Sequence, residues 1–298
     1  MASPTKTRPF PLAMSESPRP SGPVVGSLVA IAAILCLSLA SVPAVLIDPE
    51  AAVQGGLLLT APFFAVIWLV VWLWVRFKER RSFAGLGFRG RAPLAIVRGA
   101  VIGVGTIAIT VAIGVASGNL EFLDSPTGPA YWPALGWVVL GLVLFTVQGG
   151  AEELLARGYL VQAWYHRTGL TGAVIASTVF FVLLHGLNAG FGLLPVIGLV
   201  LVAVALVFWA LAEGGLWGVI AFHAAWNWAQ GSLFGISVSG NVVSESLFVV
   251  TETEDANPLI SGGVYGLEGS VVGLAILLVL AVGAVLAFLR SKQTTRLG

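Results

Sequence analysis

Long apolar runs, almost free of charged residues, constrain this chain more than any other feature of its sequence. A membrane-spanning helix needs about 20 apolar residues, because it must cross about 30 Å of hydrocarbon with every backbone polar group satisfied internally. The runs therefore predict an all-α fold, a polytopic membrane helical bundle of about eight transmembrane helices. We place the spans near Val24–Ile47, Gly55–Val75, Gly99–Ser117, Pro133–Tyr159, Thr171–Leu187, Leu193–Leu211, Leu216–Phe234 and Val271–Leu289.

The composition excludes several other classes of protein. Only 10% of the residues are charged and 57% are hydrophobic, whereas roughly 25% of the residues in a soluble domain are charged. The 15 basic residues nearly balance the 14 acidic ones, which argues against a nucleic-acid partner. The single cysteine, Cys36, excludes an internal disulfide framework and a zinc site built on cysteines.

The positions of the charges predict the orientation in the membrane, because Lys and Arg gather in cytoplasmic segments. With both the N-terminus and the C-terminus inside, all 15 basic residues except Arg157 fall in inner segments. The outer segments then hold acidic residues such as Glu121, Glu252 and Glu268 but no Lys or Arg. We therefore expect a multi-pass protein of the cell (plasma) membrane, and the Ala-, Gly- and Val-rich composition favours a bacterial inner membrane.

The same pattern divides the chain into parts. The first is polar and rich in Pro and Ser, and we expect it to be a disordered cytoplasmic tail. The long outer loop suits either a flexible cap or a segment that binds a partner. The predicted parts are the tail (1–23), three transmembrane helices with a basic cytoplasmic loop (24–131), a core with ionisable residues (132–234), the acidic outer loop (235–270), and the last transmembrane helix with a basic tail (271–298).

Ionisable side chains within a bilayer are expensive, so each one indicates a functional site. In this chain they fall on only three predicted spans, the fourth, fifth and seventh, and an uncharged polar residue accompanies them. These residues are Glu152, Glu153, Arg157, His185, His223 and Asn227.

Helix spacing sorts the residues of the fourth span. Glu153 and Arg157 are four residues apart with the acid first, which favours an ion pair on one helix face. Glu152 points about 100° away from Glu153. It has no obvious local partner, and such a carboxylate is suited to taking a proton from water.

The other two spans show a similar spacing. His223 and Asn227 share a helix face, as do Phe181 and His185, so an aromatic ring should lie beside the His185 imidazole. At a rise of 1.5 Å per residue, the two histidines, Asn227 and Glu152 can meet at one depth, on the inner side of the bilayer or near its middle. This convergence predicts a site that handles protons or binds a metal.

Three segments around these residues resemble one known family. They read E-E-L-L-A-R-G-Y-L from Glu152, F-V-L-L-H from Phe181 and H-A-A-W-N from His223. These are similar to the motifs EExxxR, FxxxH and HxxxN of the CPBP family, the CAAX proteases and bacteriocin-processing enzymes, also called the Abi family. The resemblance covers roughly residues 132–234. The best-known members of this family are the type II CAAX prenyl endopeptidases.

The resemblance implies an intramembrane endopeptidase and a role for each matching residue. Glu152 would be the base that activates water, and His185 would orient that water. His223 and Asn227 would stabilise the oxyanion, a contribution that is often the largest in such reactions. The supporting residues would be Glu153, Arg157 and Phe181.

The sequence leaves a metal ion open. A glutamate and two histidines are the ligands of many catalytic zinc sites, and the family is commonly labelled a metalloprotease, so Glu152, His185 and His223 could hold Zn²⁺. However, Glu152 cannot easily be both ligand and base, and no HExxH pairing occurs on one helix. We favour water activation by Glu152 and His185 without a tightly bound metal.

We therefore expect an enzyme that cleaves a membrane-associated or lipid-tethered polypeptide, with the lipid bilayer as its other partner. The alternative is a non-enzymatic protein, either a bacteriocin-immunity protein or a membrane scaffold. A third hypothesis is a proton-coupled transporter. The lack of repeat symmetry argues against a transporter, and the complete set of Glu, His and Asn residues favours the peptidase over the scaffold.

Overall fold

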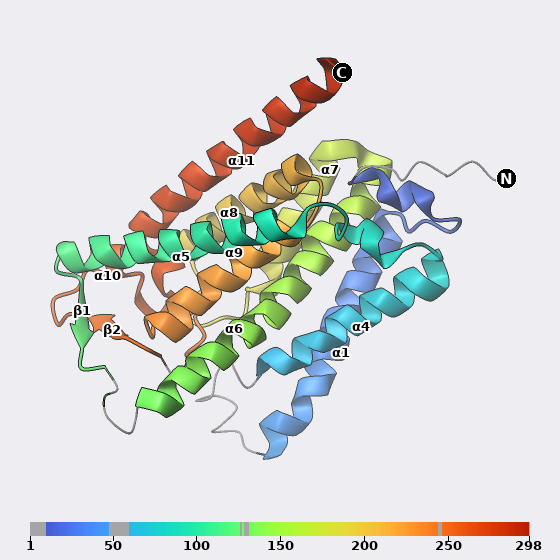
Figure 1. The fold of residues 1–298 in the computed structure, drawn as a ribbon. Helices are drawn as coiled ribbons and strands as arrows, with labels where there is room; N and C mark the ends of the chain where they lie inside the picture. The colour runs from blue at the N-terminus through green and yellow to red at the C-terminus, as the bar shows by residue number, and fades with distance from the viewer. Residues whose placement is uncertain (1–9, 48–59, 126, 128–130, 244–245, 298) are drawn as a thin grey trace.

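The computed structural model describes residues 10–47, 60–125, 127, 131–243 and 246–297. Its helices stack into a bundle with a small sheet at one end (Figure 1). Each predicted span contains a helix, although residues 55–59 of the second span lie outside the described residues. The main helices are α1 (Pro23–Ile47), α4 (Ala65–Leu73), α5 (Ala92–Ala116), α6 (Tyr131–Glu153), α7 (Val161–Leu184), α8 (Leu193–Glu213), α9 (Trp217–Trp228) and α11 (Val271–Leu297). The chain is therefore a multi-pass helical membrane protein, as the apolar runs predict.

Among the described residues, 6 helical stretches are long and apolar enough to cross a membrane. The fourth and fifth predicted spans join into one stretch, Tyr131–Leu184, which bends where Gly169 adopts φ 70° and ψ −163°. The seventh span is divided, because α9 ends at Trp228 and continues as the π-helical turn η7 (Ala229–Leu233). The count of eight spans and the orientation of the termini stay predictions.

The helices extend farther into the basic loop than their apolar runs indicate. The 3₁₀ turn η2 (Ala61–Phe64) precedes α4, and the π-helical segment η3 (Trp74–Glu79) continues it. α5 already begins at Ala92. The predicted spans leave residues 76–98 between them, whereas the observed loop is 80–91. It contains the short 3₁₀ helix η4 (Phe83–Leu86).

The prediction that residues 1–23 form a disordered tail is wrong for residues 10–22, and residues 1–9 lie outside the described residues. This segment forms the 3₁₀ helix η1 (Leu12–Glu16), in which Met14 is fully buried. Ser17 Oγ donates a hydrogen bond of 2.6 Å to the carbonyl oxygen of Glu79. Polar composition suggested a solvated tail, but these contacts join segments about sixty residues apart, which composition does not reveal.

Helix α9 lies between α5, α6 and α8 (Figure 1). Two glycines of α5 allow the close approach: a Cβ on Gly99 would lie 2.2 Å from the carbonyl oxygen of Gly218, and one on Gly103 would lie 2.6 Å from that of Phe222. Small residues at such interfaces let helix backbones pack closely in membranes. Because α9 is enclosed, its polar side chains must find their partners inside the protein.

The described residues of the outer loop are folded, so the interpretation as a flexible cap is wrong for them. Strand β2 (Val249–Glu252) pairs antiparallel with β1 (Leu120–Leu123), with Leu120 opposite Glu252. The segment then forms three short helices before α11 begins. These are α10 (Pro258–Ser261), η8 (Gly263–Tyr265) and η9 (Leu267–Gly269).

Candidate active site

Glu153 at the end of α6 connects two of the predicted site residues. Its Oε1 accepts hydrogen bonds from Arg157 Nη1 and from His223 Nδ1, each over 2.9 Å. The predicted ion pair with Arg157 is therefore confirmed, and both of its side chains are fully buried. Since an ionised carboxylate can only accept, His223 carries a proton on Nδ1 and presents Nε2 to the site.

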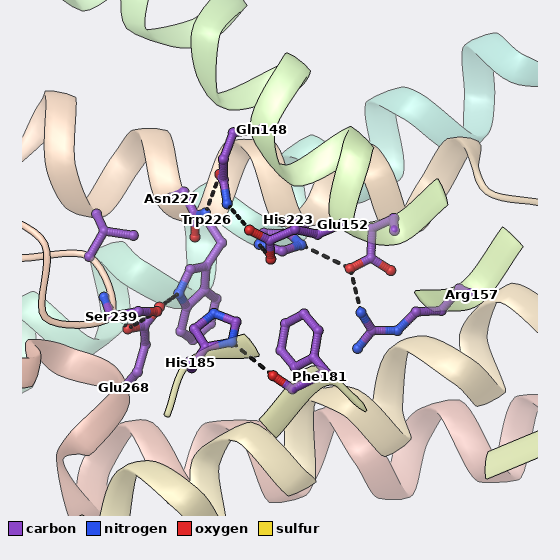
Figure 2. Close-up of polar contacts among 12 residues, drawn as sticks. Gln148, Glu152, Arg157, Phe181, His185, His223, Trp226, Asn227, Ser239 and Glu268 are labelled. Atoms are coloured by element: carbon purple, nitrogen blue, oxygen red, sulfur yellow. Dashed lines mark hydrogen bonds and ion pairs between the residues drawn. The ribbon is translucent and has the colours of Figure 1, made fainter. Parts of the chain in front are cut away.

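Arg157 lies in the π-helical segment η6 (Leu154–Leu160), which begins directly after Glu153. Segments of this kind occur frequently at functional sites. The Arg157 guanidinium carbon lies 4.2 Å from the centre of the Phe181 ring, a cation–π contact. The Phe181 ring also contacts the imidazoles of His185 and His223, with ring centres 4.8 Å and 6.1 Å apart. The predicted pairing of Phe181 with His185 is thus confirmed, and the ring separates His185 from Arg157 (Figure 2).

Glu152 does have a local partner, contrary to the prediction. Its Oε1 accepts a hydrogen bond from Nε2 of Gln148, one helical turn earlier. Gln148 in turn accepts a hydrogen bond of 3.0 Å from Nδ2 of Asn227 through its own Oε1. The amide of Gln148 therefore links the carboxylate on α6 to Asn227 on α9. The i, i+4 spacing of a second polar residue in an apolar span was the signal that could have revealed Gln148.

The second oxygen of Glu152 is the unusual atom of this site. Oε2 is buried without a hydrogen-bond partner among the described residues, and it lies 3.9 Å from Nε2 of His223. That separation is too long for a direct hydrogen bond. It suits a water molecule that contacts both groups.

His185 follows the last residue of α7, and its Nδ1 donates a hydrogen bond of 2.9 Å to the carbonyl oxygen of Phe181. Its Nε2 is then left to accept a hydrogen bond. His185, His223 and Asn227 line one cavity of about 30 Å³, which accommodates a water molecule. The structure thus brings predicted residues of α9 and of the turn after α7 together at one cavity, and Glu152 of α6 lies next to His223 without lining that cavity.

Two residues of the outer segment also line the cavity and were missed in the sequence. They are Ser239 and Glu268, and they lie opposite Trp226 (Figure 2). Burial raises the pKa of Glu268 above its ordinary value, although hydrogen bonds from Ser239 and Trp226 act in the other direction. The sequence places Glu268 in the acidic outer loop, where no pattern distinguishes it from its acidic neighbours.

The nitrogen and oxygen donors do not assemble into a zinc site. Among the residues that the structure describes, no group of three or more His, Cys, Asp or Glu side chains is arranged to hold a metal ion. The residues present therefore do not fit a three-ligand zinc ion.

A comparison with family models matches the segment that contains the three motifs. The model of the type II CAAX prenyl endopeptidase Rce1-like family matches residues 134–229. This segment of the chain is thus similar to the family of CAAX proteases that its three motifs resemble. Neither the curated proteins nor the solved structures gave a match.

The Rce1-like segment runs from α6 to the start of η7 and contains all the motif residues. It also contains Gln148 and Trp226. Ser239 and Glu268 lie beyond it. The candidate site is thus built from the segment that matches the family model together with a folded outer segment that the model does not include.

Proposed function

We propose that this protein is an intramembrane endopeptidase in which Glu152 activates water for attack on a peptide bond. The proposal rests on one observation. Glu152 Oε2 is buried without a hydrogen-bond partner among the described residues and lies 3.9 Å from His223 Nε2. The similarity of residues 134–229 to a family of endopeptidases supports this chemical interpretation.

Water activation uses Glu152 and His185. A water in contact with Glu152 Oε2 would give up a proton to the carboxylate as its oxygen attacks the scissile carbonyl carbon. Gln148 donates to Oε1 and so fixes the direction of Oε2. His185, with Nδ1 held by Phe181, would orient the same water through Nε2.

The negative charge that develops on the carbonyl oxygen would be stabilised from α9. Asn227 donates one amide hydrogen to Gln148 and retains a second for the oxyanion. His223 would donate from Nε2 when that nitrogen carries a proton, and Glu153 holds the ring through Nδ1. Such donors act strongly here, because the enclosed site has a low dielectric constant.

Collapse of the tetrahedral intermediate completes the hydrolysis. The carbon–nitrogen bond breaks, and the proton held by Glu152 passes to the leaving amine. Water therefore supplies a hydroxyl group to the acyl product and a hydrogen to the amine. Glu152 returns to its ionised state.

The proposed substrate is a membrane-associated or lipid-tethered polypeptide, because the site lies within a bundle of apolar helices. A soluble peptide would have to leave water to reach such a site. We place the protein in a bacterial inner membrane on the composition and charge pattern of the sequence.

The test compares new peptide termini, by mass spectrometry, in membranes that contain the wild type or Glu152→Gln at equal abundance. Glu152→Gln keeps the shape of the side chain and removes the base. Glu121→Gln, an exposed site on β1, is the matched control. Termini that occur with the wild type and the control but not with Glu152→Gln would support the peptidase. Identical termini in all three samples would instead favour an immunity or scaffold protein.

A further inference from the structure

Glu268 lies in η9, the short turn between the outer segment and α11. Its carboxylate accepts three hydrogen bonds. Trp226 Nε1 donates to Oε1 over 3.1 Å, and the backbone N–H and Oγ of Ser239 donate to Oε2 over 2.7 Å and 2.8 Å. The side chain therefore joins α9 to the outer segment at the edge of the cavity.

Both partners of Glu268 lead directly to residues of the proposed site (Figure 2). Trp226 precedes Asn227 in α9. Ser239 accepts a hydrogen bond of 2.8 Å from Nδ2 of Asn188 through its carbonyl oxygen. Asn188 lies in the turn that follows His185, and its backbone N–H donates to the carbonyl oxygen of His185 over 3.0 Å. Glu268 thus connects the helix that carries Asn227 with the turn that carries His185.

The backbone fixes Glu268 in this place. Its carbonyl oxygen approaches α8 so closely that a Cβ on Gly198 would lie 2.7 Å away. The backbone N–H of Gly240, the residue after Ser239, donates to the carbonyl oxygen of Tyr265 over 2.9 Å. Two parts of the outer segment are therefore tied to each other and to the bundle on either side of the Glu268 side chain.

A carboxylate suits this position because all three neighbours are donors. A glutamate offers acceptors on both oxygens, whereas a glutamine offers one oxygen and places an N–H₂ group at the other position. With glutamine, either Trp226 or Ser239 would face a second donor. The arrangement therefore requires the acid and not merely a polar side chain of the same length.

We propose that Glu268 is a positioning residue of the active site, which holds the His185 turn and the Asn227 turn of α9 at the separation that the reaction needs. This inference rests on the proposed peptidase function. It makes the outer segment a working part of the enzyme, although that segment lies outside the family model.

The first experiment measures kcat and KM on a substrate identified by its new termini. Glu268→Gln is expected to lower kcat by about 10-fold to 100-fold, as loss of an orienting residue does, and to leave KM nearly unchanged. Glu254→Gln, an exposed acid of the same segment, should match the wild type. A melting temperature that falls while kcat is kept would mean a purely structural role and would overturn the proposal.

A double-mutant cycle tests the route through Trp226. Trp226→Phe removes the donor to Oε1 and keeps the charge of Glu268. If Glu268 acts through this contact, the double variant should lose less activity than the two single losses multiplied together. Ser239→Ala, which removes one of the two bonds to Oε2, replaces Glu268→Gln if that variant does not fold. The proposal would be contradicted if the activity loss of the double variant equalled the product of the two single losses and Ser239→Ala kept full activity.

A second experiment does not depend on catalysis. The chain has 3 histidines, His166, His185 and His223, and diethyl pyrocarbonate acylates the free nitrogen of each imidazole at a rate that mass spectrometry can follow. Glu268→Gln should raise the rates at His185 and His223 severalfold and leave His166, the internal control, unchanged. Unchanged rates at all three would overturn the positioning role. If the acylation rates change but the wild type shows no proteolysis, Glu268 still positions the two histidines, and the proposed peptidase function is rejected instead.

Discussion

His223 donates a hydrogen bond from Nδ1 to Glu153 over 2.9 Å, and this contact decides which nitrogen of the ring the active site can use. The remaining nitrogen, Nε2, faces Oε2 of Glu152 at 3.9 Å. Two adjacent acids thus have different tasks. Glu153 holds partners in place, whereas Glu152 keeps one oxygen for chemistry.

Arg157→Ala should lower the melting temperature of the purified protein markedly. The change would leave the Glu153 carboxylate buried with His223 as its remaining partner, and breaking such a pair costs about 3–5 kcal/mol. Arg98→Ala is the control, since Arg98 forms an ion pair of 2.8 Å with Glu213 but is 50% exposed. An exposed pair contributes at most about 1 kcal/mol. Equal melting temperatures for the two variants would show that burial of the Glu153–Arg157 pair is unimportant.

Gln148→Ala should lower turnover while the protein stays folded. Gln148 connects Asn227 to Glu152, and loss of a residue that orients a reacting group costs about 10-fold to 100-fold. Thr146→Ala is a suitable control, because the Thr146 hydroxyl only donates to the Leu142 carbonyl on the exposed side of the same helix. Rates of peptide release from both variants, measured at saturating substrate, test this. Full activity of Gln148→Ala would remove the link from the mechanism.

These contacts show what the sequence could and could not predict. Glu153 and Arg157 lie on one helix, so spacing alone indicated their ion pair. The contact between Glu153 and His223 joins positions 70 residues apart, and it depends on how α6 packs against α9. Apolar periodicity predicts that both helices exist but not their relative rotation.

The same limit applied to the ends of the bundle. Polar segments were interpreted as solvated, yet Ser17 and Glu268 are held in place by the bundle through contacts with residues far along the chain. Composition reports an average preference for water. It does not show where hydrogen-bonding groups of the bundle, such as the Glu79 carbonyl and the Trp226 indole, lie within reach of a polar segment.

Asn227→Ala should reduce kcat more than it weakens substrate binding. An oxyanion donor acts mainly in the transition state, and removal of one costs about 10²–10³-fold in kcat. Steady-state kinetics that separate kcat from KM provide the measurement. A rise in KM with unchanged kcat would assign Asn227 to substrate binding instead.

Glu268 should make stability depend on pH in a direction opposite to that of a salt-bridged acid. Burial raises its pKa in the folded protein above the ordinary value of 4.5. At a pH between the pKa of Glu268 in the unfolded chain and its raised pKa in the folded protein, the unfolded chain has released a proton that the folded protein retains. The free energy of unfolding therefore falls as the pH rises.

Melting temperatures of the wild type and Glu268→Gln, measured from about pH 4 to about pH 7, test this dependence. The wild type should lose stability relative to the variant as the pH rises, by at most about 1.4 kcal/mol per pH unit. His185 and Tyr265 face Glu268 and are present in both proteins, so the comparison isolates Glu268. A difference that is constant with pH would mean that its pKa is not raised.

Gly99→Ala should disturb the site from a distance, because Gly99 sets the approach of α5 to α9. The added methyl group would lie 2.2 Å from the carbonyl oxygen of Gly218, so α9 must move, and His223 and Asn227 move with it. We expect a lower melting temperature and, since a shift of about 1 Å can cost 100-fold in rate, a large loss of activity. Gly105→Ala is the matched control on the same helix, where an added Cβ meets nothing within 4 Å. It should be neutral or more stable by up to about 1 kcal/mol, because alanine favours the helix. If both variants kept full activity, close packing of α5 against α9 would not be what positions the catalytic residues.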